Sequence, residues 1–592
     1  MKQNNYIRLL VILMAVAFTS CQKGFLDRTP KTAISDAEFW KSPNDLRLYC
    51  NNFYNNYLPS YRGYNTWGPY SLDDYQGSDN LANKQYSQYI LNGESITPSS
   101  SDSWSWSDIR NVNYFLQNYS KVNASWSAIQ QYVGEALFFK SMLYFAKLQN
   151  FGDLPWYNKP LGVNDTLLLK APRISRAIIA DSIIKNLDSA IAYLPSKAVA
   201  EPMRVNKEVA LALQARIALY EGTWEKYHAG TPFGVQGSTG TSFLQKAASA
   251  SQLIIDGGLY GLDNVGVPFG YWKLFNQTDY SSSKEVMLWR KFDQSQGIYT
   301  LWSAYEKLGG GRGVTKSLVD AYLCKDGQPI AVSSLYKGDD SLKGVIANRD
   351  PRLSGLIQVN DGQHFVSTNV PFYAPAFTGA NEDKNYTGYQ LYKGLNIDPA
   401  QQNNSTGGTD GVIYFRYAEV LLINAEAKAE LGTITQTDID NTINKLRDRV
   451  GMAHLNMNAI TPDPNWKFPT LSPLINEIRR ERRVELACEG YRHDDIWRWN
   501  AAKQLIVGWR PKGAKYDQFV TMKGADGKPA FTASNLALLS KGADGYVDIY
   551  FKTPAMANGY QFQLDRDYLS PIPLDQITLN PNLTQNPGWG TH

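Results

Sequence analysis

Residues Tyr132–Gln149 read YVGEALFFKSMLYFAKLQ, and small and large apolar side chains recur in them at the spacing of one helix face. Gly152 and Pro155 follow and predict that the helix ends before them. Residues 178–194 have the same character and are followed by Pro195. Because small residues let two helices approach closely, these two segments predict a tightly packed helical pair.

Two further pairs of such segments follow along the chain. Residues Glu208–Tyr220 precede Phe243–Ile255, and Tyr417–Leu431 precede Asp438–Val450. Repeated helical pairs of this kind are typical of tetratricopeptide-like units. Segments rich in Gly, Asn, Ser and Tyr separate them and are too long for plain connections: Trp67–Ser107, Gly257–Tyr305, Asn360–Gly411 and Gly508–Gln563. We therefore expect a mainly α fold, with tetratricopeptide-like helical pairs packed against an irregular, loop-rich subdomain.

The N-terminus has the features of an export signal. Lys2 and Arg8 precede the apolar run Leu9–Ala17, which is too short to span a bilayer. Small residues just before Cys21 resemble a bacterial lipobox, in which the cysteine is acylated. We expect residues 1–20 to be a lipoprotein signal peptide, Cys21 to carry the lipid, and residues 21–592 to form a single domain. An ordinary signal peptide with a coincidental cysteine is the alternative.

The amino-acid composition argues against some classes of function and is compatible with others. The 592 residues include 59 basic and 55 acidic ones, a net charge of +4, and no basic stripe is present, which argues against nucleic-acid binding. Aromatic residues make up 13%, as in carbohydrate-handling proteins and in aromatic-rich cores. The remaining cysteines, Cys50, Cys324 and Cys488, allow at most one disulfide, and buried free thiols are the favoured interpretation.

Catalytic motifs are absent from the sequence. It contains no G-x-S-x-G, Walker A or H-E-x-x-H pattern. The acidic dipeptides Asp73-Asp74 and Asp494-Asp495 are not catalytic pairs by themselves, since adjacent side chains point in different directions. Calcium binding by Asp73, Asp74 and Asp79 is conceivable, although no loop signature supports it. We predict no catalytic residue, cofactor or metal site, with a secreted glycoside hydrolase as the alternative.

Residues Ile475–Asn500, INEIRRERRVELACEGYRHDDIWRWN, are rich in charge. Glutamates at four-residue spacing alternate with arginines, which favours a salt-bridged structural helix. An anion-binding site is the alternative.

Several motifs, taken in order, resemble those of the SusD/RagB family of Bacteroidetes lipoproteins. The resemblance spans nearly the whole chain. It rests on Cys21 with Phe25-Leu26-Asp27, Trp104 with Ile109 and Asn113, EALFFK at 135–140, FGDLP at 151–155, NRDPRL at 348–353, YFRYAEVLL at 414–422, ERRVEL at 481–486 with Gly490-Tyr491-Arg492, Asp495 and Arg498-Trp499, YLSPIP at 568–573 and QNPG at 585–588.

This resemblance implies a location and a role. The protein would be anchored by lipid in the outer membrane, facing the cell exterior. It would partner a SusC-like TonB-dependent transporter and capture glycans for import, binding them without catalysis. A lid that binds peptide or another nutrient is the alternative.

The resemblance also implies that variable loops contact the ligand. Residues 57–75, YLPSYRGYNTWGPYSLDDY, concentrate rings in a segment that Pro and Gly interrupt. Continuation of the preceding helix, which would bury these rings, is the alternative. The candidate residues are Tyr61, Tyr64, Trp67 and Tyr70 for stacking, Asp73 and Asp74 for accepting sugar hydroxyl hydrogen bonds, and a second set of Trp302, Tyr305 and Arg312.

Overall fold

The computed structural model describes residues 39–58, 77–87, 97–264, 266–267, 269–379, 384–403 and 405–590. The predicted signal peptide and lipidation site Cys21 lie outside these residues. So do the first candidate ligand-binding residues, Tyr61, Tyr64, Trp67, Tyr70, Asp73 and Asp74.

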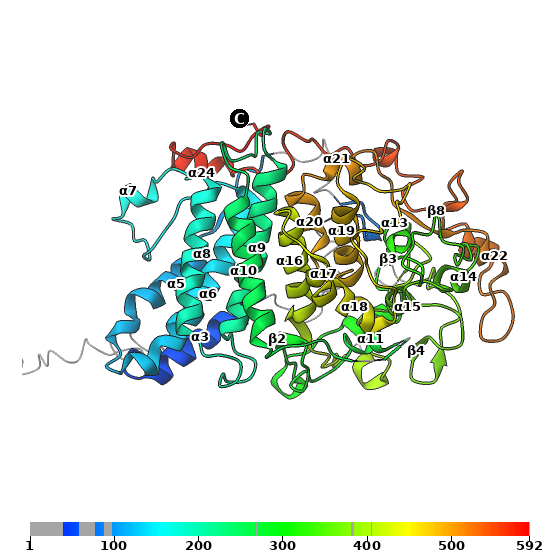
Figure 1. The fold of residues 1–592 in the computed structure, drawn as a ribbon, viewed down its shortest axis with the longest axis horizontal. Coiled ribbons are helices and arrows are strands. Elements are labelled where there is room, and N and C mark those ends of the chain that lie inside the picture. The colour runs from blue at the N-terminus through cyan, green and yellow to red at the C-terminus, as the bar shows by residue number, and fades with distance from the viewer. Residues whose placement is uncertain are drawn as a thin grey trace, which may run out of the picture.

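Long helices form one end of the molecule, on the left of Figure 1. They are α3 (Pro43–Tyr57), α5 (Ser107–Asn118), α6 (Trp126–Phe151), α8 (Arg176–Tyr193), α9 (Lys207–Tyr227) and α10 (Thr241–Gly257), with the short α7 (Thr166–Leu169) at the edge. The helical pairs α6–α8 and α9–α10 pack as predicted. Gly134 allows the close contact between α6 and α8, because a Cβ at this position would lie only 2.9 Å from Leu194 Cγ. At its other end α6 stops at Gly152, whose φ of +68° suits glycine.

The third predicted pair differs from expectation in its second helix. Helix α16 (Tyr417–Glu430) packs against α10 and against α19 (Pro473–Glu485). The segment expected as one helix over 438–450 is divided into α17 (Gln436–Asn441) and α18 (Ile443–Val450). The break falls at Thr442 (φ −126°, ψ −86°), whose hydroxyl donates a hydrogen bond to the Asp438 carbonyl at 2.6 Å. Such a side-chain bond offers the backbone an alternative to helix.

The other end of the molecule is irregular, with short helices and two-stranded antiparallel sheets on the right of Figure 1. The sheets pair β1 (Leu81–Asn83) with β3 (Arg312–Val314), β2 (Val286–Arg290) with β6 (Val412–Arg416), β4 (Phe365–Ser367) with β5 (Val370–Pro371), and β7 (Lys512–Lys515) with β8 (Tyr546–Asp548). The helices there include α11 (Gly270–Lys273), α12 (Trp302–Glu306), α13 (Lys316–Ala321), α14 (Leu342–Ile346), α15 (Pro351–Leu356), α20 (Arg492–Arg498), α21 (Ala502–Leu505), α22 (Gln518–Thr521) and α23 (Ala533–Leu536). The last helix, α24 (Leu574–Leu579), lies on the left of Figure 1, on the side of the long helices. The predicted fold class is therefore confirmed.

Helix α19 is held to three neighbouring elements by buried charges. Ser472 caps it and Pro473 occupies its first turn, as the sequence favours. The Glu485 carboxylate lies within 2.9 Å of nitrogen atoms of Arg352 on α15, Arg416 on β6 and Arg449 on α18. The interpretation of residues 475–500 as salt-bridged and structural is thus correct for this face of the helix.

The cysteines of the described chain are free. Cys50, Cys324 and Cys488 are all buried thiols, as the favoured interpretation expected. Across the described ranges, no helix combines the length and the hydropathy needed to cross a bilayer.

Candidate functional site

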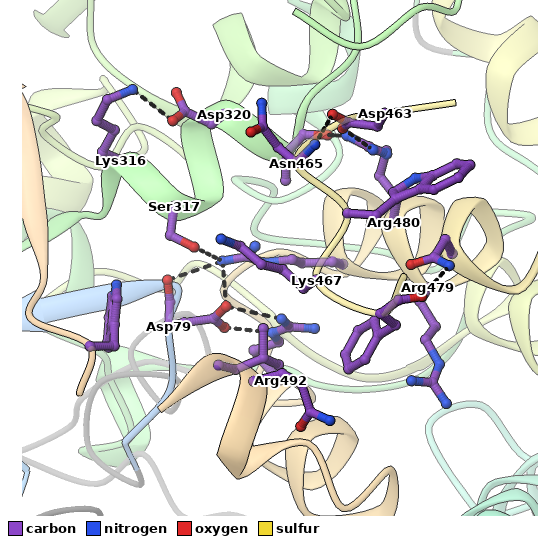
Figure 2. Close-up of a pocket in the computed structure, with 18 of the residues that line it drawn as sticks. Asp79, Lys316, Ser317, Asp320, Asp463, Asn465, Lys467, Arg479, Arg480 and Arg492 are labelled. Atoms are coloured by element: carbon purple, nitrogen blue, oxygen red, sulfur yellow. Dashed lines mark hydrogen bonds and ion pairs between the residues drawn. The ribbon is translucent and has the colours of Figure 1, made fainter. Parts of the chain in front are cut away.

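A cavity of about 560 Å³ opens between segments that lie far apart in the sequence. Helix α13, the loop 463–468, helix α19 and the segment around α21 line it, and Figure 2 shows their side chains converging. The lining comprises Asp79, Lys316, Ser317, Asp320, Ala321, Ile330, Asp463, Asn465, Trp466, Lys467, Phe468, Asn476, Arg479, Arg480, Arg483, Arg492, Gln504, Leu505, Val507, Gly508, Trp509 and Lys512.

Two partly exposed tryptophans belong to this lining. The Trp466 indole N–H donates to Glu477 Oε1 at 3.1 Å, which fixes the ring relative to α19. The Trp509 ring stacks on Tyr560, with centroids 5.9 Å apart and planes at 25°. Exposed amide side chains of Asn465 and Gln504 lie in the same lining. Fixed ring surfaces beside amides suit a ligand that has both C–H faces and hydroxyl groups.

One wall of the cavity is formed by Asp79, which lies between Arg483 and Arg492. These three residues are here called the Asp79 cluster. Arg492 Nε and Nη2 donate to the two carboxylate oxygens of Asp79 at 2.6 and 3.0 Å. Arg483 Nη2 lies 3.0 Å from Asp79 Oδ2. Burial by itself would raise the pKa of Asp79, but the two guanidinium groups outweigh it and lower the pKa to about 2.

Strand pairing places Asp79 at the cavity. β1 begins two residues later and pairs with β3, with Leu81 opposite Val314. The Thr315 backbone N–H then donates to the Asn80 carbonyl at 2.9 Å, and its hydroxyl donates to the Asp79 carbonyl at 2.6 Å. A short sheet and one threonine thus hold the carboxylate against α19 and α20.

Three other basic side chains of the lining, Lys316, Arg480 and Lys512, form separate ion pairs. Lys316 Nζ lies 2.6 Å from Asp320, and Arg480 Nη2 lies 2.6 Å from Asp463 on the opposite side of the view in Figure 2. Lys512 Nζ lies 2.6 Å from Asp548.

The described carboxyl groups of this cavity differ from the pair that glycoside hydrolysis uses. A glycosidase needs one carboxyl group with a raised pKa beside a second carboxylate. The pKa of Asp79 is lowered instead, and Asp320 and Asp463 are each paired with a cation. No group of three or more metal-ligating side chains is found among the described residues.

The second set of predicted ligand-binding residues lies elsewhere. The sequence placed Trp302, Tyr305 and Arg312 in an irregular segment, but Trp302 belongs to α12 and Arg312 to β3, and both are buried. Arg312 is ion-paired with Glu306, and its guanidinium lies 5.3 Å from the Trp302 ring centre. Only Tyr305 has a partly exposed side chain. Ligand contact by this set stays a prediction.

Sequence reasoning missed the cavity tryptophans. Trp466 lies in TPDPNWKFP, where prolines indicate a loop that could present a ring. The side chains of the dipeptide Asp494-Asp495 point to different partners, as expected of adjacent residues on a helix. Asp495 binds Arg482 and Arg498, whereas Asp494 accepts a hydrogen bond from Gln149 at 2.7 Å.

Two family models match different stretches of the chain, and both describe SusD-related proteins. A model described as the SusD family matches residues 275–589, and one described as "Starch-binding associating with outer membrane" matches residues 24–219. SusD-like protein P38 of Formosa agariphila is 22% identical over 519 residues, covering 85% of this chain and 93% of that protein.

Solved structures share the fold. A crystal structure described as a SusD-like carbohydrate binding protein from Bacteroides fragilis has a TM-score of 0.69 at 22% identity, covering 92% of this chain and all of that one. Surface glycan-binding protein A from Bacteroides uniformis has a TM-score of 0.58 at 17% identity, covering 92% and 99%. Since the first family match spans more than half of the 592 residues, the chain belongs to the SusD family.

Proposed function

We propose that this protein is a non-catalytic glycan-binding lipoprotein of the outer membrane. It would face the cell exterior, anchored through Cys21, and pass its ligand to a SusC-like TonB-dependent transporter. The observation that carries the proposal is the cavity, in which Trp466 and Trp509 lie beside Asn465 and Gln504 in a chain of the SusD family. The matched family model is described as starch-binding, and the related structures are described as carbohydrate-binding and glycan-binding, which supports the ligand class.

Rings suit this role because a ring face covers the C–H face of a sugar at a small entropy cost. Trp466 is held by its bond to Glu477 and Trp509 by its stacking on Tyr560, so little ordering remains to be done on binding. The aromatic segment 57–75, with Trp67 near its centre, stays a candidate second platform.

Replacing Trp466 with alanine is expected to weaken glycan binding about tenfold, as truncation of a central aromatic contact does. Isothermal titration of residues 22–592 against starch and a panel of plant, fungal, host and microbial polysaccharides measures this. The matched control is Trp126→Ala, because that indole is 43% exposed on α6 and does not line the cavity. Equal affinities of the two variants and the unaltered protein would rule out the cavity as the binding site.

A further inference from the structure

A second cavity lies at the helical end of the molecule and, among the described residues, none lines both cavities. Its volume is about 500 Å³, and small-molecule sites commonly have about 300–1,000 Å³. Helix α5, the segment 155–161, α7 and α24 contribute to its walls, and α7 and α24 lie on the left of Figure 1. A ligand in this second cavity would therefore be bound apart from the site proposed for glycans.

The walls of the second cavity are mainly apolar and include aromatic rings. Trp106 and Tyr157 both line it, with ring centres 5.1 Å apart and planes at 82°. Trp106 also packs edge to face against Trp104, with ring centres 5.5 Å apart, which restricts its rotation. Leu169 and Leu583 are further apolar members of the lining. Packed rings and leucine side chains suit a ligand with a flat apolar body.

A buried hydrogen-bond acceptor in this lining has no partner. Asn113 on α5 is fully buried, and its side-chain nitrogen donates to the carbonyl oxygens of Tyr157 and Lys159 at 3.0 and 3.4 Å. These two bonds fix the amide group, because reversing it would place its oxygen against two carbonyl oxygens. Asn113 Oδ1 accepts no hydrogen bond from any described residue. Because an unpaired buried acceptor is costly, the cavity favours a ligand that brings a donor to this oxygen.

The charges of the lining favour a neutral donor. Arg110, Lys159 and Lys170 line the second cavity, and no acidic side chain is among the described residues that do so. A ligand ammonium group would be repelled by these cations, since like charges brought together are unfavourable. A hydroxyl group can donate to Asn113 Oδ1 without that repulsion.

We propose that the second cavity binds a neutral aromatic molecule with a hydroxyl group, of the phenol class. In this arrangement the ligand ring lies against Trp106 and Tyr157, and its hydroxyl group donates a hydrogen bond to Asn113 Oδ1. The inference adds a small-molecule site to a chain whose proposed function uses the first cavity alone.

The test changes the ligand and leaves Asn113 unaltered, because this residue also holds the backbone at residues 157 and 159. Equilibrium dialysis of residues 22–592 compares 2-naphthol with 2-methoxynaphthalene, which has the same rings but no hydroxyl donor. We expect 2-naphthol to bind about fivefold more tightly, as one additional hydrogen bond provides. The ether is the more apolar compound, so non-specific apolar binding would favour it instead. Equal affinities, tighter binding of the ether, or no binding of either compound would overturn the inference.

Two leucine variants locate the binding. Leu169 lines the second cavity, whereas Leu167 on the same helix α7 does not, and their side chains are 44% and 89% exposed. The Leu169→Glu variant is expected to weaken 2-naphthol binding about tenfold or more, because it places a charge in the apolar wall. The matched control, Leu167→Glu, is expected to leave the affinity unchanged. Equal losses in both variants would indicate adsorption to the surface of α7, and unchanged affinity in both would place the compound elsewhere; either result would overturn the inference.

Discussion

Replacing Glu485 with alanine is expected to lower the free energy of unfolding by about 3–5 kcal/mol, because it removes a carboxylate that three buried arginines share and leaves their cluster with an uncompensated positive charge. Its carboxylate lies 2.9 Å from Arg352, 2.7 Å from Arg416 and 2.5 Å from Arg449. All four side chains are buried, so water cannot replace the lost partner. These arginines come from three elements, and the loss would therefore loosen α19 from α15, β6 and α18 together.

The midpoint of denaturant unfolding, compared with that of the unaltered protein, measures this effect. The control is Asp517→Ala, which breaks an exposed pair with Lys541 and is expected to leave the midpoint nearly unchanged. Burial alone would raise the pKa of Glu485, but Arg449, Arg416 and Arg352 hold it well below its ordinary value. The stabilisation is thus present above the unfolded pKa and lost as the pH falls through the folded one. A midpoint as high in Glu485→Ala as in the control would contradict a structural role for this network.

A second large effect is expected at the contact between α9 and α10. A Cβ added to Gly240 would lie 1.9 Å from the carbonyl oxygen of Gly222, far inside contact distance. Gly240 also has a φ of +69°, which disfavours any other residue. The Gly240→Ala variant should therefore lose about 2–5 kcal/mol of stability, since backbone strain and overpacking add.

Gly237→Ala separates these two causes. Gly237 has a φ of +75°, but a Cβ there would meet nothing within 4 Å. The Gly237→Ala variant should lose only about 1–2 kcal/mol of stability, which is the cost of the left-handed backbone conformation for a residue with a Cβ. Thermal unfolding of both variants measures the difference, and equal losses would mean that the helices do not approach as closely as the structure has them.

The helical scaffold could be predicted because its determinants are local. The apolar period of residues 132–149 and Gly152 after them fix a helix and its end without reference to the rest of the chain. The division of the helix predicted over residues 438–450 could not be foreseen in the same way, since it depends on the conformation of Thr442.

The candidate site could not be predicted from the sequence, because tertiary contacts bring its residues together. Asp79 meets Arg483 and Arg492 only because β1 pairs with β3, and the sequence gives no sign of that partnership. Composition placed Trp302 and Arg312 in a loop-rich segment, whereas both side chains are buried and Arg312 is ion-paired with Glu306. In a segment without helical or strand periodicity, the sequence does not indicate which aromatic side chains are buried. Aromatic residues in loops could therefore be proposed as ligand contacts, but their positions in the fold could not be predicted.

The most direct measurement of the central claim is a titration of residues 22–592 against the polysaccharide panel, followed by chromatography of the polymer recovered afterwards. The proposed function predicts heat of binding with at least one polysaccharide and an unchanged polymer length. A shortened polymer with new reducing ends would contradict the claim and identify a hydrolase. No heat with any polysaccharide would contradict it as well and point to a peptide or another nutrient as the ligand.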